Sequence, residues 1–407
     1  MAFLLCGGFA QGREYTFQAD AGAGQDYNSN LFLTPQPHEE IWGSNIGLNA
    51  NFSAAEEIWN VTGNTRFQNY YYSDSNLDTE NIFLTLIGNY SQNERTRWGL
   101  RGNYTRDSTR TSFTEVNDLV FQQVGRDGKS LNPSWTYALD EKTSLNLDYQ
   151  FQTTEYDKTE NSSFPDSQVH TGTAGLQHRY DDRLQLNGTF SFTRYTLPGS
   201  ATSTPFGPFL TLENVSEETR IDYANLLAGF SYAVDETFDV GLSGGGQYSM
   251  TEAGSRSLLR DTSGNELVLD EQHLTSETPT WLLNANATKR FERSQIGFDF
   301  SKSSSPNIYG DLIDDTRYSL VVKHGFTPLL NGSARLVYSE RGTGQVDSDA
   351  LLHSYSAQTG LDWSLTESWT VSASYRYTQQ AIDTADERPE NHAVFLNVRY
   401  LWDKVQF

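Results

Sequence analysis

The sequence predicts an all-β fold: a transmembrane antiparallel up-and-down β-barrel of about 18 strands, with short periplasmic turns and long extracellular loops. Three observations favour it. Apolar and polar residues alternate strictly along segments that follow short turns. No stretch approaches the roughly 20 apolar residues that a spanning helix needs. Mean hydropathy is only -0.59 although aromatic residues make up 13% of the chain. A barrel with one oily face and one wet face accounts for all three.

The alternation is clearest after the turn at 366–368, where apolar residues occupy every second position from Trp369 to Tyr377. A period of two identifies strands, and about 9 to 11 such residues cross a bilayer when tilted. The same pattern follows seven other short turns. The eight turns lie near 54–57, 92–95, 140–142, 181–183, 234–236, 292–294, 326–329 and 366–368.

Between the turns lie longer polar segments that hold most of the prolines and many of the acids. Eight turns alternating with nine such loops predict eighteen antiparallel strands, with both termini in the periplasm. No composition break marks a separate plug domain. The predicted loops lie near 33–39, 74–79, 108–117, 157–166, 198–216, 251–274, 305–313, 341–349 and 382–391.

Aromatic residues gather at the two ends of the predicted strands, as they do at both interfaces of a membrane. A soluble β-sandwich or β-helix would also show alternation, but it would not need so many strands of this length. The tryptophans near the turn ends are Trp59, Trp98, Trp135, Trp363, Trp369 and Trp402. The tyrosines near the loop ends are Tyr70, Tyr71, Tyr72, Tyr104, Tyr195, Tyr338 and Tyr377.

The N-terminal residues 1–12 are interpreted as the remnant of a secretory signal peptide, and residues 13–407 as one outer-membrane barrel. An apolar stretch precedes Gly8-Phe9-Ala10, which has small residues where a signal peptidase cleaves. Lipid attachment at Cys6 is the alternative. Cys6 is the only cysteine, so the barrel needs no disulfide. The net charge of -23 argues against nucleic acid as a partner.

The C-terminal strand is expected to carry the signal that the outer-membrane assembly machinery reads. His392 to Trp402 alternates well, and the chain ends in Phe407, with Val405 two residues before it. Asp403 and Lys404 interrupt the alternation. A β-bulge near Asp403 would return the final residues to the apolar face.

If the apolar positions face lipid, the lumen receives mainly basic side chains. Cations in a lumen favour the passage of anionic solutes or polymers. The alternative is that these cations pair with lumenal acids such as Asp148 and stiffen the wall. The predicted lumen-lining cations are Arg66, Arg101, Arg317, Lys323, Arg335, Arg376 and Arg399.

Nothing in the sequence indicates an enzyme or a cofactor site. Gly241-Leu242-Ser243-Gly244-Gly245 matches a nucleophile-elbow pattern, but it lies in a predicted strand, where the glycines would let the wall bend. The seven histidines are scattered without recognisable partners. Loop acids such as Asp74, Glu217 and Asp311 could bridge divalent cations, although a solvated surface is the simpler interpretation.

The first predicted strand carries a family resemblance. Residues 19–32, ADAGAGQDYNSNLF, resemble the opening of β-barrel porins associated with exosortase (PEP-CTERM) and exopolysaccharide loci, where a glycine-rich strand ends in a D/Y-x-N-x-hydrophobic turn. Residues 45–50, NIGLNA, look similar, without the proline usual before them. The resemblance implies an outer-membrane protein linked to polysaccharide export or surface-protein sorting, and it supplies no catalytic residues.

Together these observations predict a channel of the bacterial outer membrane that exports an anionic exopolysaccharide. Two alternatives remain: a general anion-preferring diffusion porin, and a plugged structural or adhesive barrel that acts through its loops. The expected partners are outer-membrane lipid and lipopolysaccharide, the barrel assembly machinery, and periplasmic polysaccharide-export components.

Overall fold

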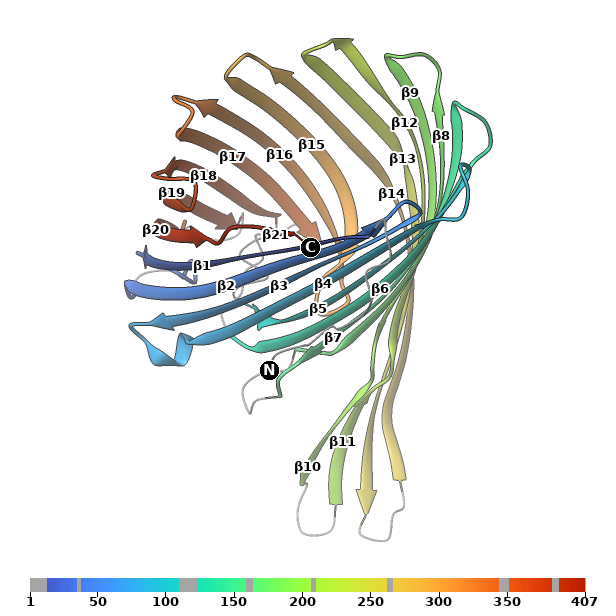
Figure 1. Cartoon of the computed structure of the whole chain (residues 1–407). Helices are drawn as coiled ribbons and strands as arrows, with labels where there is room; N and C mark the ends of the chain where they lie inside the picture. The colour runs from blue at the N-terminus through green and yellow to red at the C-terminus, as the bar shows by residue number, and fades with distance from the viewer. Residues whose placement is uncertain are drawn as a thin grey trace.

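The computed structural model shows a closed antiparallel barrel of 18 strands, as the sequence predicts, with a projecting extension (Figure 1). It describes residues 13–34, 38–109, 123–158, 164–205, 210–261, 266–343, 351–382 and 388–406. The proposed signal remnant, residues 1–12, lies outside this range. The described part of the chain contains no helix long and apolar enough to cross a membrane.

The first half of the barrel consists of nine strands in chain order, each paired with the next. One 3-10 turn, η1 (Ser75–Leu77), follows β3. The strands are β1 (Glu14–Asn28), β2 (Ile41–Glu56), β3 (Trp59–Tyr72), β4 (Thr79–Ser91), β5 (Thr96–Ser108), β6 (Gly125–Ala138), β7 (Thr143–Tyr156), β8 (Ser167–Arg179) and β9 (Leu184–Leu197).

The second half continues with nine further strands, and β20 pairs with β1 to close the barrel. Closure leaves no open sheet edge in the bilayer, where an unpaired backbone group would be costly. These strands are β12 (Thr219–Asp235), β13 (Phe238–Asp261), β14 (Glu266–Arg290), β15 (Ser294–Pro306), β16 (Leu312–Gly325), β17 (Leu330–Thr343), β18 (Leu351–Ser364), β19 (Trp369–Ile382) and β20 (Glu390–Leu401).

Short turns join the strands at one rim, where the eight clusters had been predicted, and acidic side chains close several of them. The Asp140 carboxylate accepts the backbone N–H of Lys142 at 2.7 Å, and Asp181 accepts that of Arg183 at 2.7 Å. These backbone hydrogen bonds lower the pKa of both carboxyl groups. The turns are therefore best stabilised in the ionised form of the two aspartates.

Two of the predicted loops are wrong. Segment 198–216 forms a hairpin, β10 (Ser200–Pro205) and β11 (Leu210–Ser216), and most of segment 251–274 continues β13 and β14 beyond the barrel. The four strands form an extension on the loop side of the barrel (Figure 1). These segments have loop-like composition because neither side of the extension faces lipid, so no apolar alternation is needed.

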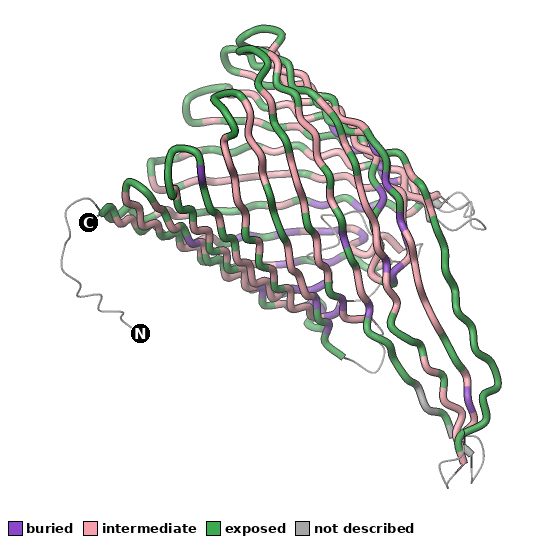
Figure 2. Tube along the Cα trace, turned by 90° about the vertical axis from the view of Figure 1, so that its right-hand side faces the viewer, coloured by how far each residue is buried: buried purple, intermediate pink, exposed green. Residues whose placement is uncertain are grey.

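The pairing register assigns every strand residue to one of two faces, because residues directly opposite each other share a face. Large apolar side chains are exposed on one face of all the barrel strands. Leu86 is 50% exposed, Leu226 66% and Leu396 53%. Exposed and half-buried residues dominate the strands in Figure 2, and buried ones are few. Such a belt is stable only against lipid, so this is the outer face.

The predicted bulge near Asp403 is present. Leu401 pairs with Asp20, whereas Val405, in the short strand β21 (Val405–Gln406), pairs with Phe17. The C-terminal segment thus has one residue more than β1 between these pairs. The extra residue returns Val405 to the outer face beside Phe17, and Phe407 lies outside the described residues.

Candidate functional site: the lumen

The inner wall is lined by neutral polar side chains that hydrogen-bond to one another across strands. Asn64 donates to the amide oxygens of both Asn49 and Asn51 at 2.7 Å. Thr85 donates to Asn103 at 3.0 Å. These bonds satisfy the amides and hydroxyls locally, so the wall is hydrophilic but has few free donors of its own.

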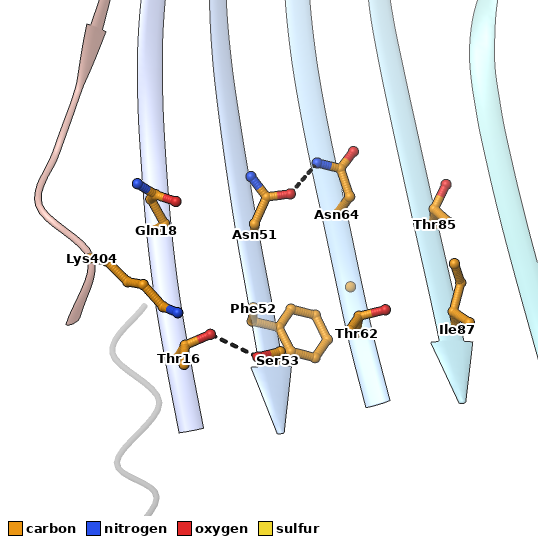
Figure 3. Close-up of a pocket in the computed structure, with 11 residues that line it drawn as sticks. Thr16, Gln18, Asn51, Phe52, Ser53, Thr62, Asn64, Thr85, Ile87 and Lys404 are labelled. Atoms are coloured by element: carbon orange, nitrogen blue, oxygen red, sulfur yellow. Dashed lines mark hydrogen bonds between the residues drawn. The ribbon is translucent and has the colours of Figure 1, made fainter. Parts of the chain in front are cut away.

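A cavity of about 320 Å³ lies on this wall between β1 and β4, toward the turn rim (Figure 3). Thr16, Asn51 and Asn64 line it, and Ile87 is an apolar member of the lining. The side chain of Lys404 reaches into it from the segment before β21. The alternation of the sequence does not predict this cation, because the bulge decides which way the Lys404 side chain points.

The register places all seven predicted cations on the inner face. Arg335 and Arg376 both lie opposite Gln358, and Arg101 lies opposite Asn132. Arg317 and Arg376 are half-buried, and the others are exposed. The wall positions are Arg66, Arg101, Arg317, Lys323, Arg335, Arg376 and Arg399.

Most of these cations have no acidic partner. Within the described residues, no carboxylate forms an ion pair with six of them: Arg66, Arg101, Arg317, Lys323, Arg335 and Arg399. The Arg66 guanidinium lies over the Phe83 ring, 4.1 Å from its centre, a contact that leaves its charge uncompensated. The alternative in which the cations pair with lumenal acids is therefore not supported for Arg66, Arg101, Lys323, Arg335 and Arg399, whereas Asp315 lies two positions from Arg317 on the same face.

Charge is segregated around the wall. The seven cations lie on ten consecutive strands that run from β16 through the closure to β5. The other eight strands place Asp148 and Asp299 on the inner face, neither in an ion pair among the described residues. Of the basic residues there, Arg126 and Arg290 pair with Asp107 and Asp239, and Arg179 donates to the Glu141 carbonyl at 3.1 Å. The ten strands also place carboxylates on the inner face, among them Asp20, Asp315 and Asp362, but the cations outnumber them. That side of the lumen is thus net basic, and the opposite side is close to neutral.

The inner wall is exposed toward the turn rim and packed toward the loop rim. Ile41, Tyr72 and Leu77 form a buried apolar cluster there, together with Leu31 and Phe32. Chain segments therefore cover the inner wall near the extracellular mouth. The buried inward polar residues at that level are Asp26, Asn81, Asp107, Thr154, Ser167, Thr193, Gln247, Ser249, Ser339, Ser354, Gln380 and Asn391.

One covering segment, residues 307–311 between β15 and β16, reaches across to β9. The Tyr195 hydroxyl donates to the Asn307 carbonyl at 3.3 Å, although β12, β13 and β14 separate β9 from β15. The Asn307 side chain accepts the backbone N–H groups of Tyr309 and Asp311 at 2.9 and 2.8 Å, which holds the segment compact. Segment 307–311 therefore narrows the extracellular mouth.

The two predicted aromatic belts fare differently. The six predicted tryptophans lie at the turn ends of the outer face; Trp59, for example, donates to Glu56 at 2.6 Å. Three predicted belt tyrosines, Tyr70, Tyr72 and Tyr195, instead point into the barrel. Period two cannot identify the face of a strand end at which every residue is aromatic, as in Tyr70–Tyr72.

Several histidines do have partners, contrary to the sequence interpretation, although the buried His38 Nδ1 has none among the described residues. Three on the outer face toward the loop rim share hydrogen bonds with tyrosine hydroxyls: Tyr149 with His170 at 2.7 Å, Tyr338 with His353 at 2.9 Å and Tyr375 with His392 at 2.7 Å. His392 lies within β20, as its alternation predicts, whereas His273 lies within β14, where the sequence predicts a loop. Each Tyr–His pair joins adjacent strands, and only the register reveals it.

The nucleophile-elbow pattern of the sequence does not form a strand-to-helix elbow in the structure. Gly241–Gly245 lies inside β13, as predicted. Among the described residues, no group of three or more His, Cys, Asp or Glu side chains is placed to hold a metal ion. Of the loop acids, Asp74 caps η1 by accepting the backbone N–H of Asn76 at 3.0 Å.

No protein-family model and no curated protein matches the sequence. The fold resembles the ferric yersiniabactin uptake receptor FyuA of Yersinia pestis, with TM-score 0.50 and 10% identity over 96% of this chain and 80% of that chain. OccAB4 of Acinetobacter baumannii matches with TM-score 0.48 and 10% identity over 98% and 99% of the two chains. OpdQ of Pseudomonas aeruginosa matches with 0.47 and 8% over 95% and 97%.

At this level of identity the comparison with FyuA concerns the fold alone. The closed barrel without a free edge and the apolar outer belt specify a bilayer as the surroundings. The chain is therefore an 18-stranded antiparallel β-barrel of the bacterial outer membrane.

Proposed function

We propose that the barrel is an outer-membrane channel for anionic solutes, and that its substrate is an acidic exopolysaccharide moving outward. The observation that carries the proposal is the set of six inward cations without an ion pair on one side of the lumen. An uncompensated charge lowers the energy of a mobile counterion beside it, and a basic wall therefore concentrates anions.

The polymeric form of the substrate has two further supports. Arg335 and Arg376 flank Gln358 in one cross-strand row, and Arg399 and Lys323 lie nearer the turn rim. Cations at several depths suit a chain with repeated carboxylates better than a single ion. The likeness of residues 19–32 to exosortase-associated porins favours the same substrate class.

The experiment is planar-bilayer recording of the purified barrel, with reversal potential under a salt gradient. We expect anion-selective conductance that oligogalacturonate, an acidic glycan, blocks from the periplasmic side, where the lumen is exposed. Dextran of equal length serves as the uncharged control. If the channel is anion-selective but the two glycans block it equally, the general anion-preferring porin is the remaining interpretation. Absence of conductance would favour a plugged barrel that acts through its loops.

Segment 307–311 is expected to limit the conductance. Gly310 has φ of 86°, and a Cβ there would lie 2.7 Å from Leu197 Cδ1. This left-handed backbone conformation costs a β-branched residue more than about 1 kcal/mol. Gly310→Val should therefore release segment 307–311 from β9 and raise the single-channel conductance.

Gly172→Val is the matched control for this substitution, since nothing lies within 4 Å of a Cβ at Gly172. Its conductance should equal that of the wild type. If Gly310→Val folds and conducts like the wild type, segment 307–311 does not set the width of the mouth.

A further inference from the structure

The extension exposes a sheet edge that is independent of the lumen. β14 pairs with β15 only from Leu283 to Arg290, whereas β14 pairs with β13 almost along its whole length. From Glu266 to Leu282, the side of β14 away from β13 has no strand partner among the described residues.

Two prolines explain why β15 leaves β14. Continuing their register past Leu283 and Lys302 would place Pro279 opposite Pro306. Neither residue has a backbone N–H, so the ladder cannot continue there. Farther out, the β13–β14 register shifts between Ser257 and Leu258, which leaves Leu269 as the extra residue of a bulge. Residues 270–278 are the regular part of this free edge, here called the acidic edge.

The acidic edge lacks most of the features that protect free strands. Natural edges are blunted by charged side chains, especially lysine, by proline, by bulges or by short length, and only the carboxylates of this edge belong to that set. Residues 270–278 contain no proline, lysine or arginine, and the nine residues exceed the usual strand length of about five to six. Residues 270–277 are exposed, and Leu274 has 60% of its surface exposed.

The charge of the acidic edge determines which kind of strand can pair with it. Asp270, Glu271 and Glu277 give the acidic edge three carboxylates, with His273 as its one basic side chain. Glu271 and Glu277 are six positions apart and therefore lie on one face of the strand. A second copy of this chain would bring like charges together, which disfavours pairing. A strand with lysine or arginine at alternate positions would be attracted instead.

We propose that the acidic edge accepts an extended basic segment of a second protein as an added β-strand. Backbone hydrogen bonds along residues 270–278 supply the common contact, and Glu271 and Glu277 recognise alternate cations. The other face of the strand offers Leu274 to an apolar side chain of the partner.

The test uses the whole barrel in lipid nanodiscs and a fluorescent twelve-residue peptide with lysine and threonine in alternation. We expect binding by anisotropy and slower amide exchange within residues 270–278. A peptide with the same charges, N-methylated at every second amide, should bind at least about tenfold more weakly, since it cannot complete the ladder.

Asp270→Asn/Glu271→Gln/Glu277→Gln should weaken binding of the lysine peptide by about tenfold. Glu141→Gln/Glu236→Gln/Glu292→Gln makes the same charge change in the turns at the opposite rim and should bind like the wild type. The proposal is overturned if the lysine peptide does not bind or if the N-methylated peptide binds equally well. It is also overturned if the peptide-free protein dimerises with the amides of residues 270–278 already protected.

Discussion

Replacing Arg101, Arg317, Arg335 and Arg399 by serine should abolish most of the anion selectivity of the channel. None of the four forms an ion pair within the described residues, and each lies on the basic side of the lumen. A unit charge about 4 Å from a mobile ion in water contributes about 1 kcal/mol. We expect the anion-to-cation permeability ratio to fall by about tenfold, which corresponds to about 1.4 kcal/mol.

The matched control removes four cations from the outer face, Arg106, Lys129, Arg194 and Arg220, also by serine. All four pair with carboxylates there; Arg194, for example, lies 2.8 Å from Asp222. The net charge of the protein changes equally in both variants, but the field in the lumen changes only in the first. Equal loss of selectivity in both would show that overall charge, not the lumen wall, selects anions.

Gly245→Ala should be the most damaging single substitution in the barrel wall. A Cβ at this position would lie 1.8 Å from the Leu226 carbonyl oxygen and 2.9 Å from the Leu227 Cα. Both are backbone atoms of the paired strand β12, so no side-chain rotation relieves the overlap. The strands must separate, at a cost of about 3 kcal/mol or more.

Thermal unfolding, followed by the mobility of the heated barrel on gels, measures the effect. Gly188→Ala is the control because nothing lies within 4 Å of a Cβ at Gly188, and its stability should stay within about 0.5 kcal/mol of the wild type. A Gly245→Ala barrel that unfolds at the wild-type temperature would mean that β12 and β13 approach less closely than the structure indicates. That result would concern the packing of the barrel wall and would not test the proposed channel function.

Much of this protein is encoded locally. The period of two in segments such as Trp369–Tyr377 determines which side chains share a face, and the acidic clusters mark the turns. Within the bilayer, each strand has lipid on one side and water on the other, so its residues must alternate between apolar and polar. The strand number and even the bulge near Asp403 therefore follow from the residues alone.

The tertiary structure decided those features that the alternation of apolar and polar residues does not encode. Beyond the membrane both faces of a strand are wet, so β10, β11 and the outer parts of β13 and β14 carry no alternation and resemble loops. Barrel closure brings Arg399 and Arg66 to the same side of the lumen, and it lets Asn307 reach Tyr195 across three strands. Contacts of this kind join residues that are distant in the chain. The local alternation of a strand cannot predict them, because it contains no information about which strands are its neighbours.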